Sequence, residues 1–223
     1  MAISKVDICN LALSALGDQA NVSSIDPPDD SAQAHYCATY YPVAKNAVLS
    51  GANYPWSFAL RRVTLSETTN ESIEWLKCFV MPSDMIGFSE FLDANGNHVV
   101  DYNVELHTGN VRVVYCNAEL LQCRYVSSDT PEGLFTQPFI DALILTLQYY
   151  LVGSIVKGDV GVAARKAIYQ QMLAGVSLAR TADSQYSRPQ RRYTPSILVS
   201  NGTRGDVIMS AGGAVYPKSY EVY

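Results

Sequence analysis

The sequence predicts an α+β fold that is mainly α: a helical bundle with a small antiparallel β-sheet or hairpin region and an extended C-terminal arm. Three observations predict this class. Four segments carry helical periodicity or long apolar runs, short alternating stretches fill about residues 62–117, and the chain after residue 182 has no sustained period. We therefore expect a domain of residues 1–182 followed by an arm of residues 183–223.

The predicted helices begin at recognisable signals. Ser4, with Asp7 three residues later, approximates a capping box. Asp29 or Asp30 can cap the second helix after a proline-containing loop, and Thr136 can cap the third. The expected helices span about residues 4–16, 31–50, 137–157 and 160–180.

The third predicted helix is apolar almost all the way round, which predicts a buried position at the centre of the bundle. Its length would also suit a membrane span. Asp141, Gln148, Gly153 and Ser154 interrupt the apolar run, however, so we expect no membrane. The fourth helix is rich in alanine, and small residues allow close contact between helices.

The region of about residues 62–117 alternates between apolar and polar residues, which predicts an antiparallel meander. Its strongest turn signal is Asn95-Gly96 in the stretch DANGN, because a type I′ turn needs positive φ at both central residues. The stretch superficially resembles a calcium loop. Its glycine stands at position 4 instead of 6, and Val104 stands where the twelfth position needs Glu, so we interpret it as a hairpin.

The composition favours a subunit of an assembly. Of the 223 residues, 48% are hydrophobic and only 17% are charged, which is little charge for the surface of a solitary monomer. A net charge of -5 weighs against a protein that grips nucleic acid over its whole surface. The five cysteines lack the density of a disulfide scaffold and the N-terminus lacks a signal core, so we expect reduced, cytoplasmic thiols.

The sequence offers no set of catalytic or metal-binding residues. It contains no nucleophile elbow, phosphate loop or dinucleotide fingerprint. The histidines and cysteines lack the close pairs that structural zinc sites use. We therefore predict no catalytic residue, no metal and no cofactor.

The arm contains one basic and aromatic cluster, formed by Arg188, Arg191, Arg192 and Tyr193. Such side chains can touch phosphate or stack on a base. In an acidic chain so short a patch favours contact with protein, and we predict that these residues contact another subunit or partner.

The stretch GANYPWSFALRR, residues 51–62, could form a ligand cage, a membrane anchor or a structural plug. Trp56 and Phe58 lie two residues apart on an expected extended segment, directly after a helix whose apolar face needs covering. We predict a plug. In it, Pro55 stops the helix, and Trp56 and Phe58 close the bundle against the sheet.

The order of these signals resembles the tail tubular protein A family, the head-to-tail adaptors (connectors) of short-tailed bacteriophages. The resemblance covers about residues 1–182 and rests on diffuse stretches in a fixed order. These are KVDICNLALSALGD, HYCATYYPVAKNAVLS, YPWSFALRRVTL, VMPSDMIGF, and VRVVYCNAE followed by FTQPFIDALILTLQYYLVGSIV.

This resemblance implies a non-enzymatic structural protein of a podovirus-like virion, assembled in the host cytoplasm. It implies a homo-oligomeric ring of about twelve copies at the head–tail interface. The ring would join the portal protein to the tail nozzle protein, and tail fibres are a further candidate partner. Double-stranded DNA would pass through the channel for packaging retention and ejection without specific binding. The arm would then reach the portal or an adjacent subunit.

The alternative function is a virion-associated hydrolase acting on host cell-surface polysaccharide or peptidoglycan. Such an enzyme needs a cleft with opposed carboxylates. The acidic residues here fall at expected caps, turns and solvent-facing helix positions, which favours the structural interpretation.

Overall fold

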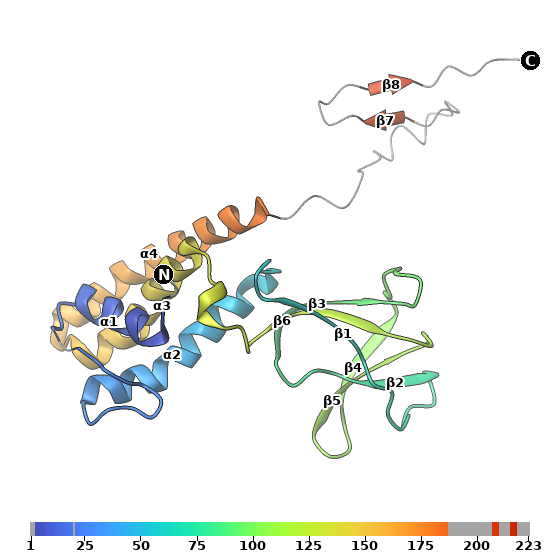
Figure 1. Ribbon diagram of the computed structural model, residues 1–223, viewed down its shortest axis with the longest axis horizontal. Coiled ribbons are helices and arrows are strands. Elements are labelled where there is room, and N and C mark those ends of the chain that lie inside the picture. Colours follow the sequence, from blue (N-terminus) through green and yellow to red (C-terminus); the bar gives the residue numbers. More distant parts are fainter. Residues whose placement is uncertain (1–2, 20, 187–206, 210–214, 218–223) are drawn as a thin grey trace, which may run out of the picture. The chain divides into compact units, whose positions relative to one another are not determined.

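The computed structural model describes residues 3–19, 21–186, 207–209 and 215–217 (Figure 1). The chain divides into two compact units, Met1–Tyr186 and Ser187–Tyr223, which are described separately. The predicted contact residues Arg188, Arg191, Arg192 and Tyr193 lie outside the described residues.

The first unit combines a helical bundle with small antiparallel sheets, which confirms the predicted α+β class with mainly α content. Two short 3-10 helices, η1 and η2, flank the sheet region. The helices are α1 (Lys5–Ala15), α2 (Ala32–Ser50), η1 (Gly51–Asn53), η2 (Glu132–Leu134), α3 (Gln137–Ile155) and α4 (Gly158–Ser184).

Hydrogen bonds at the helix ends explain where α1 and α2 begin. Ser4 Oγ accepts from Asp7 N at 3.1 Å and the Asp7 carboxylate accepts from Ser4 N at 3.0 Å, so the predicted capping box is confirmed. The cap of α2 is Ser31 and not Asp29 or Asp30 as predicted, since Ser31 Oγ accepts from Ala34 N. Asp29 instead accepts from Ser31 and secures the loop before the helix.

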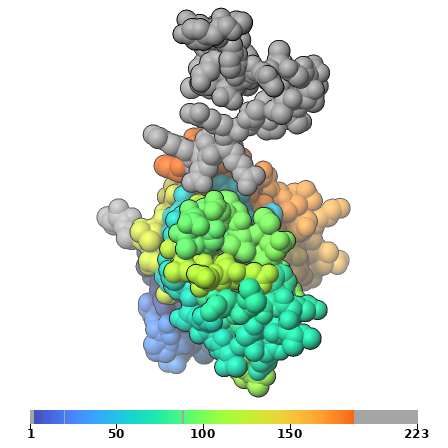
Figure 2. Space-filling view, turned by 90° about the vertical axis from the view of Figure 1, so that its right-hand side faces the viewer, coloured from blue at the N-terminus to red at the C-terminus, as the bar shows by residue number. Residues whose placement is uncertain are grey.

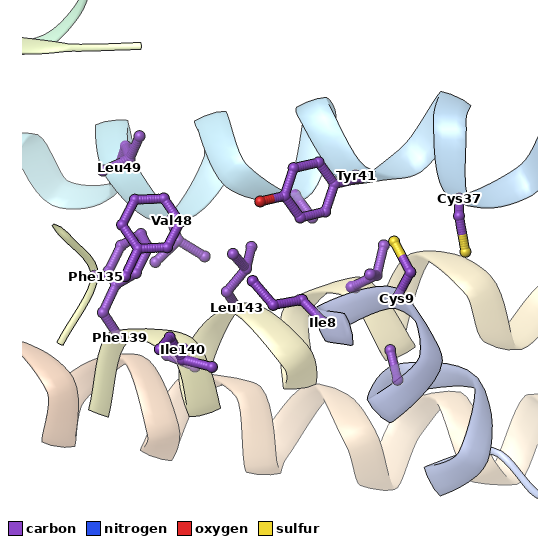
Figure 3. Close-up of a cluster of buried hydrophobic side chains, with 14 of the residues drawn as sticks. Ile8, Cys9, Cys37, Tyr41, Val48, Leu49, Phe135, Phe139, Ile140 and Leu143 are labelled. Carbon is purple, nitrogen blue, oxygen red and sulfur yellow. The ribbon is translucent and has the colours of Figure 1, made fainter. Parts of the chain in front are cut away.

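Helix α3 lies at the centre of the bundle, in contact with α1, α2 and α4, as its apolar sequence predicted. The main core cluster joins side chains of α1, α2 and α3 (Figure 3). Thr136 stands at the N-cap of α3, as predicted, although its side chain makes no capping hydrogen bond. Gly175 of α4 faces α3 closely: a Cβ there would lie 2.7 Å from Leu145 Cδ1.

Six strands of the first unit form two three-stranded antiparallel sheets, with the orders β1-β6-β3 and β2-β5-β4. Of these six strands, only β4 and β5 are neighbours both in sequence and in a sheet, so the predicted meander over residues 62–117 was wrong. The central strand β6 lies beyond that range, and alternation in sequence does not specify which strands pair. The strands are β1 (Leu60–Thr64), β2 (Lys77–Val80), β3 (Met85–Leu92), β4 (Tyr102–His107), β5 (Val111–Cys116) and β6 (Gln122–Ser127).

The turn at Asp93–Asn97 forms, but not as the predicted type I′ turn. Gly96 has a φ of 80°, whereas Asn95 is not among the residues with positive φ. The Asp93 carbonyl accepts from Gly96 N at 3.0 Å, and its carboxylate accepts from the backbone N of Asn95 and Asn97, each at 2.8 Å. The carboxylate therefore holds the turn. Beyond it the chain crosses from β3 of one sheet to β4 of the other.

A second core cluster fills the space where the two sheets meet. Its members come from both sheets, among them Phe79 and Val114 of one and Phe91 and Tyr125 of the other. In Figure 2 the teal, green and yellow-green residues of the sheet region occupy the middle of the face shown. All five cysteines are buried and free.

The second unit contains two described strands, β7 (Val207–Met209) and β8 (Val215–Pro217), which pair antiparallel with Ile208 opposite Tyr216.

Candidate functional site

Trp56 is the centre of the predicted plug and has no exposed surface. Its ring meets the Phe139 ring of α3 edge-on, with centroids 5.0 Å apart, and Tyr54 packs on another side at 4.9 Å. Its Nε1 donates to the carbonyl oxygen of Val48, in the last turn of α2, at 3.2 Å. Trp56 therefore fills the core where α2 ends and satisfies one of the carbonyls that a helix end leaves free.

Phe58 packs beside Trp56. Its ring centroid lies 4.8 Å from that of Phe139 and 5.7 Å from that of Phe135. The segment that carries both rings is a turn and not the extended segment predicted, because Ala59 N donates to the Trp56 carbonyl. The turn brings both rings onto one helix, α3.

Pro55 does not stop α2, contrary to the prediction. The helix ends at Ser50, and Ala52 and Asn53 take positive φ values of 51° and 52°. Pro55 follows this change of direction and leads into the turn at Trp56. The helix therefore ends through a left-handed backbone that the proline did not signal.

The plug is also tied to the end of α4, an interaction that the sequence did not reveal. Asp183 is 1% exposed and accepts from Ser57 N at 3.0 Å and Ser57 Oγ at 2.6 Å. Tyr54 Oη donates to the Arg180 carbonyl at 2.9 Å, and burial, with the nearby charge of Asp183, raises the pKa of Tyr54 to about 12. Asp183 was assigned to the arm, but it lies in the last turn of α4.

One face of α4 carries a stripe of side chains at steps of three and four residues. Several are apolar and exposed, such as Leu173 at 47%. The stripe consists of Val162, Arg165, Tyr169, Leu173, Val176 and Arg180.

Two adjoining hollows lie along this stripe. One, of about 330 Å³, lies between α2, α3 and α4 and includes Val48, Tyr150 and Arg180 in its lining. The other, of about 290 Å³, includes Val162 and Arg165. Tyr149 and Tyr169 line both, so the hollows form one groove, here called the α4 groove.

A second apolar surface lies on the sheet region. Val104 and Leu106 are exposed and stand two residues apart on β4, so their side chains share one face of that strand. Leu106 is 65% exposed. We call this face of β4 the hairpin surface. Exposed apolar side chains on one face are typical of surfaces that a partner covers.

A third hollow, of about 560 Å³, contains Tyr41, Lys45 and Glu132. Tyr41 Oη donates to Glu132 Oε1 at 3.0 Å, and Lys45 Nζ lies 3.3 Å from the same oxygen. Burial opposes ionisation of Glu132, but a backbone hydrogen bond, the Lys45 charge and the Tyr41 hydroxyl outweigh it and lower its pKa. The other carboxylate of this hollow, Asp26, pairs with Lys5 at 3.0 Å. Each carboxylate thus has a lysine partner, an arrangement that stabilises the fold and is unlike a pair of opposed catalytic acids.

No group of three or more His, Cys, Asp or Glu side chains suited to a metal ion occurs within the described part of the chain. Helix α3 is long and apolar enough to cross a membrane by length and composition alone, and half of its most apolar window is buried inside the protein. A scan against protein-family models and a search of curated proteins gave no match for this chain.

The predicted site residues therefore fall into two groups. Trp56 and Phe58 meet on α3, while Pro55 lies beside them in the turn. The basic cluster of the arm lies outside the described residues. Sequence reasoning missed the α4 groove, although the spacing of its side chains was readable.

Proposed function

We propose that this chain is a structural subunit of a ring that joins the portal to the tail nozzle of a short-tailed phage, as the family resemblance implies. The observation that carries the proposal is the presence of two separate apolar surfaces, the α4 stripe and the hairpin surface, on one compact unit. A ring whose subunits meet head to tail needs two different contact surfaces on each subunit.

The remaining features support the same function. Among the charged side chains that line the described hollows, Lys5, Asp26, Lys45 and Glu132 form ion pairs, and Arg165 packs on the Tyr149 ring. The core is anchored by Trp56 at the junction of helices and sheet, which suits a rigid building block. A net charge of -5 per copy would give a ring of about twelve copies a charge near -60, a lining along which DNA slides without being held.

Substitution of one exposed leucine on each surface tests this proposal. Leu106→Glu and Leu173→Glu each place a charge where the proposal requires burial between subunits. Leu134 is also exposed, at 56%, but belongs to neither surface, so Leu134→Glu is the matched control.

The chains are mixed with portal rings of the virus that encodes them and imaged by negative-stain electron microscopy. The wild type and Leu134→Glu should add a ring of density to the portal, whereas Leu106→Glu and Leu173→Glu should not. Rings of normal appearance from both surface variants would contradict the proposal.

A further inference from the structure

The α4 groove consists of two adjoining hollows with aromatic and aliphatic walls and cationic side chains towards both ends. Tyr149 and Tyr169 join its two hollows, Arg165 and Lys166 line one end, and Arg180 lines the other. No acidic residue is among those that line either hollow, although the chain as a whole is acidic. A ligand that matches this lining carries negative charge next to aromatic or aliphatic groups.

Arg180 has unused hydrogen-bonding capacity inside this groove. Its Nε is buried and has no hydrogen-bond partner. A Cβ added to Gly51 would lie 2.8 Å from Arg180 Nη2. The guanidinium therefore lies directly against the backbone at Gly51. A buried donor without a partner destabilises the protein unless a ligand supplies an acceptor. A carboxylate fits, because the guanidinium fork matches its two oxygens.

Arg165 shows that the other end of the groove is already ordered. Its guanidinium carbon lies 4.8 Å from the centre of the Tyr149 ring, and its Nη2 is 3.4 Å from the Tyr149 hydroxyl. From Arg165 to Arg180 the groove follows α4 for about 22 Å, at 1.5 Å per residue. An extended peptide of about seven residues covers that length.

The chain itself contains a segment of this length. Residues 217–223 read PKSYEVY, in which Lys218 is basic and Glu221, the one acidic residue, stands between aromatic and aliphatic side chains. Pro217 is the last residue of β8, and residues 218–223 lie outside the described structure.

We propose that the α4 groove binds residues 217–223 of a second copy of this chain, with the Glu221 carboxylate accepting hydrogen bonds from Arg180. This inference rests on the proposed function, because a ring brings a neighbouring copy to every groove. The groove and the segment are different parts of one chain, so the contact repeats from copy to copy, as closure of a ring requires.

A photocrosslinking experiment on the full chain tests the contact. Tyr220 is replaced by p-benzoylphenylalanine, and equal amounts of unlabelled and ¹⁵N-labelled chain are mixed before irradiation. Crosslinks from position 220 to the tryptic peptide of residues 167–180 are expected, with mixed-isotope pairs as frequent as same-isotope pairs. The proposal is overturned if position 220 crosslinks only to other parts of the chain or only to another protein. It is also overturned if every groove crosslink joins residues of the same isotope, because the contact then lies within one copy.

Charge variants test the role of the ion pair. Glu221→Gln and Arg180→Gln should each lower the yield of the groove crosslink about tenfold, the effect of losing a hydrogen bond to a charged group. Arg62 and Glu119 are exposed and do not line the groove, so Arg62→Gln and Glu119→Gln should leave the yield unchanged. An unchanged yield in Glu221→Gln, whose substitution lies outside the folded core of the first unit, would refute the pairing.

The same chains, mixed with portal rings, separate this inference from the proposed function. If the wild type forms portal-bound rings but gives no crosslink from position 220 to residues 167–180, the groove contact is wrong and the adaptor function stands. If the groove crosslink forms between copies but no chain binds portal, the contact stands and the adaptor function is wrong.

Discussion

Replacement of Trp56 by alanine should nearly unfold the protein. Trp56 is fully buried, and truncation of a buried tryptophan typically costs about 3 to 5 kcal/mol. The variant also removes the donor to the Val48 carbonyl, and an unsatisfied buried acceptor costs about 1 to 3 kcal/mol. Together these terms reach at least about 4 kcal/mol, close to the whole stability of many domains.

Two further variants separate the contributions. Trp56→Phe keeps an aromatic ring beside Phe139 but loses the Nε1 donor and part of the indole volume, so it should cost about 1 to 3 kcal/mol. Trp75, the other tryptophan, is partly buried against a small cluster, so Trp75→Ala should cost less than about 2 kcal/mol.

Urea unfolding followed by far-UV circular dichroism gives the free energy of unfolding for each variant. The free energy of unfolding should fall most in Trp56→Ala and less in Trp56→Phe and Trp75→Ala. The reasoning is refuted if Trp56→Ala loses less than about 1 kcal/mol, or no more than Trp75→Ala does.

Three other predictions concern buried polar groups and close contacts. Asp183→Asn should lower the free energy of unfolding by about 1.5 to 3 kcal/mol in urea melts, because the charged hydrogen bonds to Ser57 are lost, and no change would contradict the role of Asp183. Asp84 and Glu132 have lowered pKa values in the folded protein, so their contribution is present at neutral pH and is lost as the pH falls through those values. Urea melts at a series of pH values should therefore show constant stability above about pH 5 and a decline below about pH 4, and a decline absent at low pH would contradict the assignment. Gly161→Ala should cost about 1 to 3 kcal/mol in thermal or urea unfolding, because its Cβ would stand 2.1 Å from a backbone oxygen, whereas Gly153→Ala, with open space, should not destabilise by clash.

The helices were predictable because their signals are local. The capping box at Ser4 and the apolar run of α3 act within a few residues, and both appear in the structure where the sequence placed them. The end of α2 was harder to predict. Pro55 looked like the terminator, but positive φ at Ala52 and Asn53 ends the helix earlier, and neither residue type announces that conformation.

The strand pairings were not predictable by the same reasoning. Strand β6 pairs with β1 and β3, so Cys123 lies opposite both Val63 and Phe91. Such contacts join residues far apart in the chain, and alternation identifies a strand without naming its partners. The Asn95-Gly96 pair did mark the turn, although the Asp93 side chain and not a type I′ backbone holds it.

The plug was predicted from the local sequence, whereas the α4 groove was not. The stretch around Trp56 stands out in the sequence because it is rich in aromatic residues. The burial of Trp56 follows from its place after an apolar helix. The α4 groove was missed because the alanines of that helix seemed to mark its contact face. In the structure Ala163 and Ala167 are exposed, and the larger side chains of Tyr169 and Leu173 belong to the α4 stripe and line the groove.

Native mass spectrometry of the full chain mixed with portal rings tests the central claim most directly. The account predicts a complex in which about twelve copies of the chain join each portal ring, in keeping with closed cyclic symmetry. A chain that remains monomeric in the presence of portal and adds no mass to it would contradict the account.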